Sequence, residues 1–253
     1  MFKTVIVGAG NGAGDADATA LAALLADPGA SVTPAHIEHG SVGHGLHDAA
    51  VERGADLIVV GSSHCGLLGR IFAGDDVAAT LRSAPCTVAV APRGFAGSER
   101  ALARIGVGYD RSPQAQTAME AAKALAAREG ARIRALGVAT PPQGLTTPIG
   151  VSAVAALEAK RDQIERCIAD LGGDIDGEVL DGIAHQRLAE LSTEVDLLVV
   201  GSSRHSGIGR VLLGNTSETL SREAACPLLV VTAPASSPPS PEQPDQPASA
   251  PAG

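Results

Sequence analysis

Residues 55–74, ADLIVVGSSHCGLLGRIFAG, and residues 195–214, VDLLVVGSSRHSGIGRVLLG, are two versions of one segment, 140 positions apart. Ten of their twenty aligned positions are identical. Each copy runs from an apolar strand through a glycine-containing loop into the start of a helix, where backbone N–H groups can face a phosphate. The repeat therefore predicts two similar domains, each with one candidate binding loop.

The composition indicates how the cores are built and which class of partner is not expected. The 253 residues are 45% hydrophobic but only 2% aromatic, and tryptophan is absent. Cores of Val, Ile, Leu and Ala are typical of parallel sheets that helices cover on both faces. The formal net charge of -9 argues against nucleic acid as a partner, because binding to a phosphate backbone requires a basic surface.

Cysteine usage and the amino terminus indicate a compartment. The four cysteines, at positions 65, 86, 167 and 226, show no C-x-x-C spacing, and we interpret them as small buried residues in a reducing cytosol. The chain opens as MFKTVIVGAG, straight into a strand and a glycine turn, without the pattern of a signal peptide. No apolar run approaches the ~18 residues that a membrane span needs. We therefore expect a cytoplasmic chain that does not enter a membrane.

Short apolar runs alternate with helical patterns throughout, which predicts right-handed βαβ units around a parallel sheet. The expected fold class is α/β, with two tandem doubly wound parallel-sheet domains. Expected strands are 4–7, 31–37, 56–60 and 87–91 in the first half, and 105–107, 132–138, 176–180, 195–200 and 228–231 in the second. Expected helices are 15–25, 45–53, 75–82, 113–129, 152–171, 183–191 and 217–222.

The two halves differ in length. Val7-Gly8 aligns with Val107-Gly108 at an offset of 100, whereas the glycine loops align at an offset of 140. The first half is therefore shorter between its first strand and its loop by about one strand and one helix. We predict that the first domain lacks one βα unit and that its sheet is one strand narrower.

These features divide the chain into a first domain over 1–96, a second domain over 97–232 and a tail over 233–253. The tail holds seven of the chain's 16 prolines and no apolar residue larger than alanine. Such a segment buries too little surface to offset its ordering entropy, so we expect it to be disordered.

The glycine loops and their flanks resemble the universal stress proteins, in a tandem two-domain form. The motif of that family is glycine, two residues, glycine, nine residues, glycine and then Ser or Thr, after the fourth strand. The resemblance covers about residues 2–232 and includes the D-L-[IL]-V-V-G-S-S run before each loop. It implies domains of the adenine-nucleotide-hydrolase-like type with five parallel strands. It also implies that the two domains pair through their last strands, Thr87–Ala91 against Leu228–Val231, as an intramolecular pseudo-dimer, while a homodimer of the whole chain stays open.

In the second domain the resemblance implies an ATP site, with or without Mg²⁺. Asp110 matches the aspartate near the nucleoside, and Val138 matches the residue that contacts adenine. Two departures stand in the phosphate loop: Arg204 replaces the second motif glycine, where it can clash or pair with phosphates, and Asn215 replaces Ser/Thr. Asn215 keeps a polar side chain that caps a helix start well. The matching loop residues are Gly201, Gly214, Asn215 and Ser217.

The first domain departs further from the family pattern. Gly10 stands at the position of Asp110, and His64 replaces a motif glycine. Asp75 and Asp76 follow the last loop glycine, where carboxylates would repel a phosphate. A pair of unit charges about 4 Å apart interacts by up to about 4 kcal/mol at an effective dielectric of 20. We therefore predict that the first domain binds no ATP and is a structural, degenerate copy.

Other readings of the chain remain. The loop glycines alone also suit tight turns in any doubly wound fold. The histidines at 36, 39, 44 and 47 suggest a metal site, but a solvated strand end and helix explain them more simply. Ser62, Ser63, Ser202 and Ser203 have no histidine placed as a base, so serine catalysis is not expected.

We interpret the chain as an ATP-binding stress-response module that is not an enzyme. The alternatives are a nucleotide-independent scaffold of the same fold, and a weak ATPase or nucleotidyl transferase.

Overall fold

The computed structural model describes residues 1–9, 14–36, 42–62, 75–97, 101–140, 151–172, 175–204, 211–212 and 215–232. The side chains at 75–76, 151–153, 203–204, 211–212 and 215 are outside the description. The tail prediction for 233–253 also lies outside the described residues.

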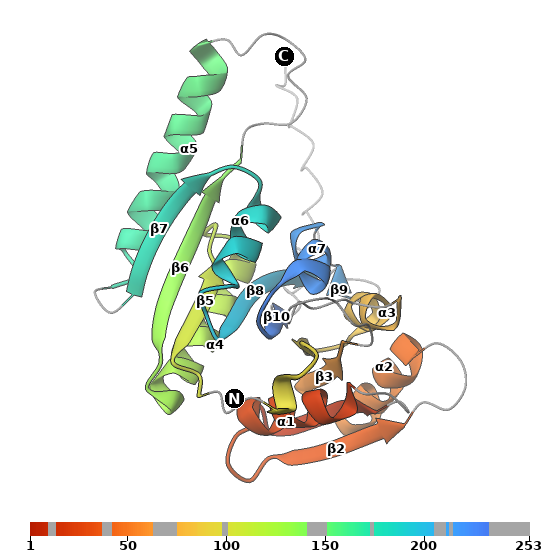
Figure 1. The fold of residues 1–253 in the computed structure, drawn as a ribbon. Coiled ribbons are helices and arrows are strands. Elements are labelled where there is room, and N and C mark those ends of the chain that lie inside the picture. The colour runs from red at the N-terminus through yellow and green to blue at the C-terminus, as the bar shows by residue number, and fades with distance from the viewer. Residues whose placement is uncertain are drawn as a thin grey trace, which may run out of the picture.

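Nine strands of the described chain form one continuous sheet in the order β2-β1-β3-β4-β10-β8-β5-β6-β7 (Figure 1). The first half contributes β1 (Thr4–Ala9), β2 (Ser31–His36), β3 (Leu57–Gly61) and β4 (Thr87–Ala91). The second half contributes β5 (Arg104–Gly108), β6 (Arg132–Ala139), β7 (Ile175–Asp181), β8 (Leu197–Arg204) and β10 (Leu228–Thr232). A short strand, β9 (Val211–Leu212), pairs with the end of β8.

Helices cover both faces of the sheet, and each face has its own apolar core. One core packs α1 (Asp15–Leu25), α4 (Pro113–Glu129) and α5 (Val151–Ala169) against the strands. The other packs α2 (Val42–Arg53), α3 (Asp75–Ser83), α6 (Ala184–Leu191) and α7 (Asn215–Glu223) against the opposite face. Both cores contain residues of both halves, so on each face of the sheet the core continues from one half into the other.

The predicted α/β fold is confirmed, with small differences at the ends of elements. Every expected strand and helix is present. The helix expected from 45 begins at Val42, and the strand expected to end at 200 continues to Arg204. A 3-10 turn at Phe95–Gly97 and the strand β9 were not predicted, because elements of two or three residues carry no periodic pattern.

The unit that the first half lacks corresponds to α5 and β7 of the second half. In the first half Gly8 lies beside Leu46 of α2 and Val60 of β3. In the second half Gly108 lies in the same way beside Leu188 of α6 and Val200 of β8. These contacts make α2 the counterpart of α6, which leaves α5 and β7 without a counterpart in the described part of the first half. The sheet of the first half is therefore one strand narrower, as predicted.

The two halves meet through their last strands. β4 and β10 pair antiparallel, with Val88 opposite Val230, while every other pair along the nine-strand path is parallel. This is the pairing of Thr87–Ala91 with Leu228–Val231 that the resemblance implied. None of the helices in the described residues combines the length and the apolar character that crossing a membrane demands.

Candidate functional site

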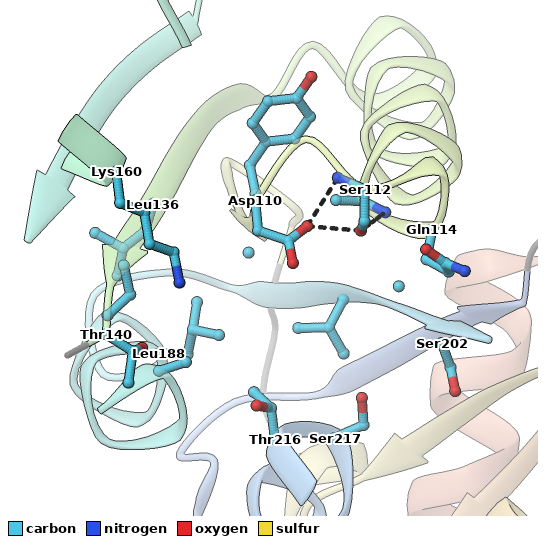
Figure 2. Close-up of a pocket in the computed structure, with 17 residues that line it drawn as sticks. Asp110, Ser112, Gln114, Leu136, Thr140, Lys160, Leu188, Ser202, Thr216 and Ser217 are labelled. Atoms are coloured by element: carbon cyan, nitrogen blue, oxygen red, sulfur yellow. Dashed lines mark hydrogen bonds between the residues drawn. The ribbon is translucent and has the colours of Figure 1, made fainter. Parts of the chain in front are cut away.

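A cavity of about 420 Å³ lies at the carboxyl ends of β5, β6 and β8 (Figure 2). β5 is the first strand of the second half along the chain, and in the sheet it lies between β6 and β8. Such a change in strand order opens the crevice in which ligands bind in open α/β sheets. The volume lies in the ~300–1,000 Å³ range of small-molecule sites. One wall is apolar, formed by Leu136, Val138, Leu188 and Val200.

A tight turn after β5 presents a carboxylate to this cavity. Asp110 Oδ1 accepts hydrogen bonds from the Ser112 backbone N–H at 3.0 Å and from the Ser112 hydroxyl at 2.6 Å. Ser112 caps α4 by accepting from the Ala115 N–H at 3.1 Å, and Pro113 opens the helix. The second carboxylate oxygen of Asp110 points into the space between the strand ends (Figure 2). The turn thus holds one acceptor in place and leaves another for a ligand.

The carboxyl end of β8 passes very close to the first turn of α4. A Cβ added to Gly201 would lie 2.3 Å from the carbonyl oxygen of Gln114. In the first half, a Cβ on Gly61 would lie 2.1 Å from the carbonyl oxygen of Gly14. Both approaches are too short for any side chain, so packing of strand against helix requires glycine at both positions. The first motif glycine is therefore a property of the fold and carries no information about a ligand.

The amino terminus of α7 forms the side of the cavity opposite Asp110. The helix begins at Asn215, and Thr216 and Ser217 both line the cavity (Figure 2). Unpaired N–H groups and the helix dipole make such a terminus attractive to an anion. Lys160 of α5 lines the cavity from the β6 side and adds a positive charge. The space therefore combines an apolar wall, a carboxylate and an anion-attracting end.

Comparison with known proteins decides the family. The Universal stress protein family matches residues 1–92 and 102–232. The chain belongs to the universal stress protein family. A universal stress protein of Mycobacterium tuberculosis is 29% identical over 217 residues, which are 82% of this chain and 74% of that protein. A universal stress protein of Mycolicibacterium smegmatis is 28% identical over 204 residues, covering 77% of this chain and 67% of that protein.

Solved structures show the same fold. A universal stress protein from Archaeoglobus fulgidus matches with a TM-score of 0.55 at 19% identity, covering 79% of this chain and 71% of that chain. A functionally unknown protein from Pseudomonas aeruginosa matches with a TM-score of 0.59 at 17% identity, covering 90% and 81%. At these identities the likeness concerns the fold alone.

The cavity of this universal stress protein gathers four of the predicted site residues: Asp110, Val138, Gly201 and Ser217. Arg204 ends β8 and Asn215 begins α7, but their side chains are not described, and Gly214 lies outside the described residues. In the first half Asp75 and Asp76 begin α3 with undescribed side chains, and Gly10 and His64 lie outside the description.

Sequence reasoning missed several residues that line the cavity. Ser112 followed by Pro113 is a helix-start signal that could have been read next to Asp110. Lys160 carries no signal, because it comes from the middle of a helix 50 positions further along the chain. The other missed polar residues are Gln114 and Thr140.

The described histidines of the first half, at positions 36, 44 and 47, do not form one cluster. His36 is exposed at the end of β2, and His44 is exposed on α2. His47 Nδ1 lies 2.6 Å from the carbonyl oxygen of Ser83, which ties α2 to α3. His39 lies outside the described residues, within which no three His, Cys, Asp or Glu side chains are grouped as metal ligands.

Proposed function

We propose that this universal stress protein binds ATP in the cavity of its second half and acts as a stress-response module without catalytic activity. The observation that carries the proposal is the arrangement around one space at the strand-order change. An apolar strand-end wall, the carboxylate of Asp110 and the amino terminus of α7 all face it. These three features match the base, the ribose and the phosphates of a nucleotide.

The residues present fit such a ligand part by part. Val138 and Leu136 at the end of β6 offer an apolar surface for adenine. The oxygen of Asp110 that Ser112 leaves open would accept from the ribose hydroxyls. Thr216 and Ser217, with the N–H groups of the first turn of α7, would hold the phosphates, which carry Mg²⁺ with them.

The first half supports the proposal of a single nucleotide per chain. Its described residues include no counterpart of α5 and so none in the place of Lys160. Its loop also leads into Asp75 and Asp76, whose charges oppose a phosphate at the start of α3.

Calorimetric titration with Mg²⁺-ATP tests the proposal. We expect one site per chain in the wild type and an affinity lower by about tenfold or more in Asp110→Asn. A hydrogen bond to a charged group is worth about 1.5–3 kcal/mol, and 1.4 kcal/mol is a factor of ten. The matched control is Asp176→Asn, at an exposed position of β7, which should leave the affinity unchanged.

Three outcomes would contradict the proposal. If the wild type shows no heat of binding, the hypothesis of a nucleotide-independent scaffold replaces the proposal. If Asp110→Asn and the wild type bind ATP with equal affinity, the ATP site lies away from Asp110. Steady release of ADP that Asp110→Asn abolishes makes the protein an ATPase.

A further inference from the structure

Glu218 stands in the first turn of α7, directly after the cavity-lining Ser217. Glu218 does not itself line the cavity, but it belongs to the helix turn at which the proposed function places the phosphates, and the inference that follows rests on that function. A side-chain carboxylate and a phosphate are both attracted to a helix amino terminus, but they repel each other. Left alone, Glu218 would lower the affinity for a nucleotide.

The first half of the chain supplies a cation to this carboxylate. Arg82 of α3 hydrogen bonds through Nη2 to Glu218 Oε1, across the contact between α3 and α7. Arg222, one turn further along α7, lies 3.8 Å from the same oxygen. The Arg82 and Glu218 side chains are 55% and 31% exposed, so water reaches the ion pair but screens its charges only in part.

The contact runs in one direction only. At the repeat offset of 140, α3 aligns with α7, Arg82 aligns with Arg222, and Glu218 aligns with Ala78. Ala78 is buried, so the first half has no carboxylate at the matching place. The arginine was thus kept in both copies, while the carboxylate that it neutralises stands only beside the cavity.

We propose that the first half sets the nucleotide affinity of the second half through Arg82, which neutralises Glu218 at the phosphate end of the cavity. Removing Arg82 takes one positive charge away from this helix end and leaves Glu218 with Arg222 alone. Removing Glu218 leaves a positive charge there. The two changes act in opposite directions on ATP and leave adenosine, which has no phosphate, unaffected.

Titrations of Arg82→Gln, Glu218→Gln and the double variant with ATP and with adenosine test this. We expect ATP to bind about three- to tenfold more weakly to Arg82→Gln and more tightly by a similar factor to Glu218→Gln. Each substitution changes one charge near the phosphates, and solvent screens that charge in part. The double variant should return to near the wild-type affinity. All differences should shrink at high salt, because screening weakens exposed charges.

The matched control is Arg134→Gln, which removes an arginine that pairs with Glu178 and Glu194 away from the cavity. It should not change the affinity for ATP. Exposed ion pairs contribute little to stability, so all four variants should fold, and circular dichroism checks this.

Unchanged ATP affinity in Arg82→Gln overturns this inference alone, provided that the wild type binds ATP. Weaker binding of ATP and adenosine alike in both single variants also overturns it, since that pattern reports a structural contact between α3 and α7. Failure of the wild type to bind ATP overturns the proposed function and the inference with it.

Discussion

At the scale of single residues, identity between the two copies reflects the backbone more than a ligand. Asp56 accepts from the N–H groups of Lys3 and Thr4, at 2.8 and 3.2 Å. Asp196 accepts in the same way from Ala103 and Arg104, at 3.0 and 2.8 Å. Asp56 directly precedes β3 and Asp196 directly precedes β8. Each aspartate therefore ties the start of that strand to the start of the neighbouring strand, β1 or β5. Like the loop glycines Gly61 and Gly201, these positions preserve the fold in both halves.

Tyr109 gives a residue-scale prediction about pH. Burial, followed by the charge of Cys167, raises the pKa of the Tyr109 phenol above its ordinary value of 10.0. The folded protein therefore keeps a proton that the unfolded chain releases, so stability declines as pH rises beyond about 10. Because Tyr109 is the one tyrosine and tryptophan is absent, phenolate absorbance reports this group alone.

We expect the phenolate titration of the folded protein to have a higher midpoint than that of the urea-unfolded chain. Tyr109→Phe should weaken the loss of stability in alkali relative to the wild type. Coincident midpoints in the folded and unfolded states would contradict this assignment.

At the scale of elements, the absent βα unit leaves one strand uncovered. Val5 pairs with Val32 on β2, and Ile105 pairs with Ile133 on β6, so Val32 and Ile133 hold equivalent places. Ile133 is 6% exposed and belongs to the core that α5 covers, whereas Val32 is 42% exposed. β2 is an edge strand, and Pro34 removes one N–H from it, which discourages pairing with another chain.

Equivalent truncations on the two strands should therefore differ in cost. We expect Ile133→Ala to lower the free energy of unfolding by about 2–4 kcal/mol, as a buried large-to-small change does. Val32→Ala should cost about 0.5 kcal/mol or less, because the side chain already meets water. Urea unfolding measures both, and similar costs would show that something covers β2.

In the molecule as a whole, two shared cores, the Arg82–Glu218 ion pair and a capping arginine join the halves. Besides the pairing of β4 with β10, Arg128 at the end of α4 reaches the end of α1 in the first half. Its guanidinium donates to the carbonyls of Leu25 and Ala26, at 3.1 and 3.0 Å, and also to Leu24. These carbonyls end a helix and have no helical partner, so Arg128 acts as a cap supplied by the other half.

Arg128→Ala should lower the free energy of unfolding by about 1.5–3 kcal/mol, the range for hydrogen bonds to a charged group. Urea unfolding with a single transition would show that the halves unfold together. The control is Arg166→Ala, whose guanidinium donates to the carbonyl of Asp162 in its own helix and which should cost far less. Equal costs for the two variants would count against a cap between the halves.

The amino-acid sequence was enough to predict the order of strands and helices, the duplication, the missing βα unit and the pairing of β4 with β10. Periodicity, turn residues and the offset between copies express these locally, and the resemblance supplied the last. It also placed Asp110, Val138, Gly201 and Ser217, which the structure brings to one cavity. It is the folded chain that brings Lys160 to them, Arg82 to Glu218 across 136 positions and Arg128 to the end of α1. These contacts depend on which helices and strands become neighbours in the folded sheet, and no local pattern in the chain records them.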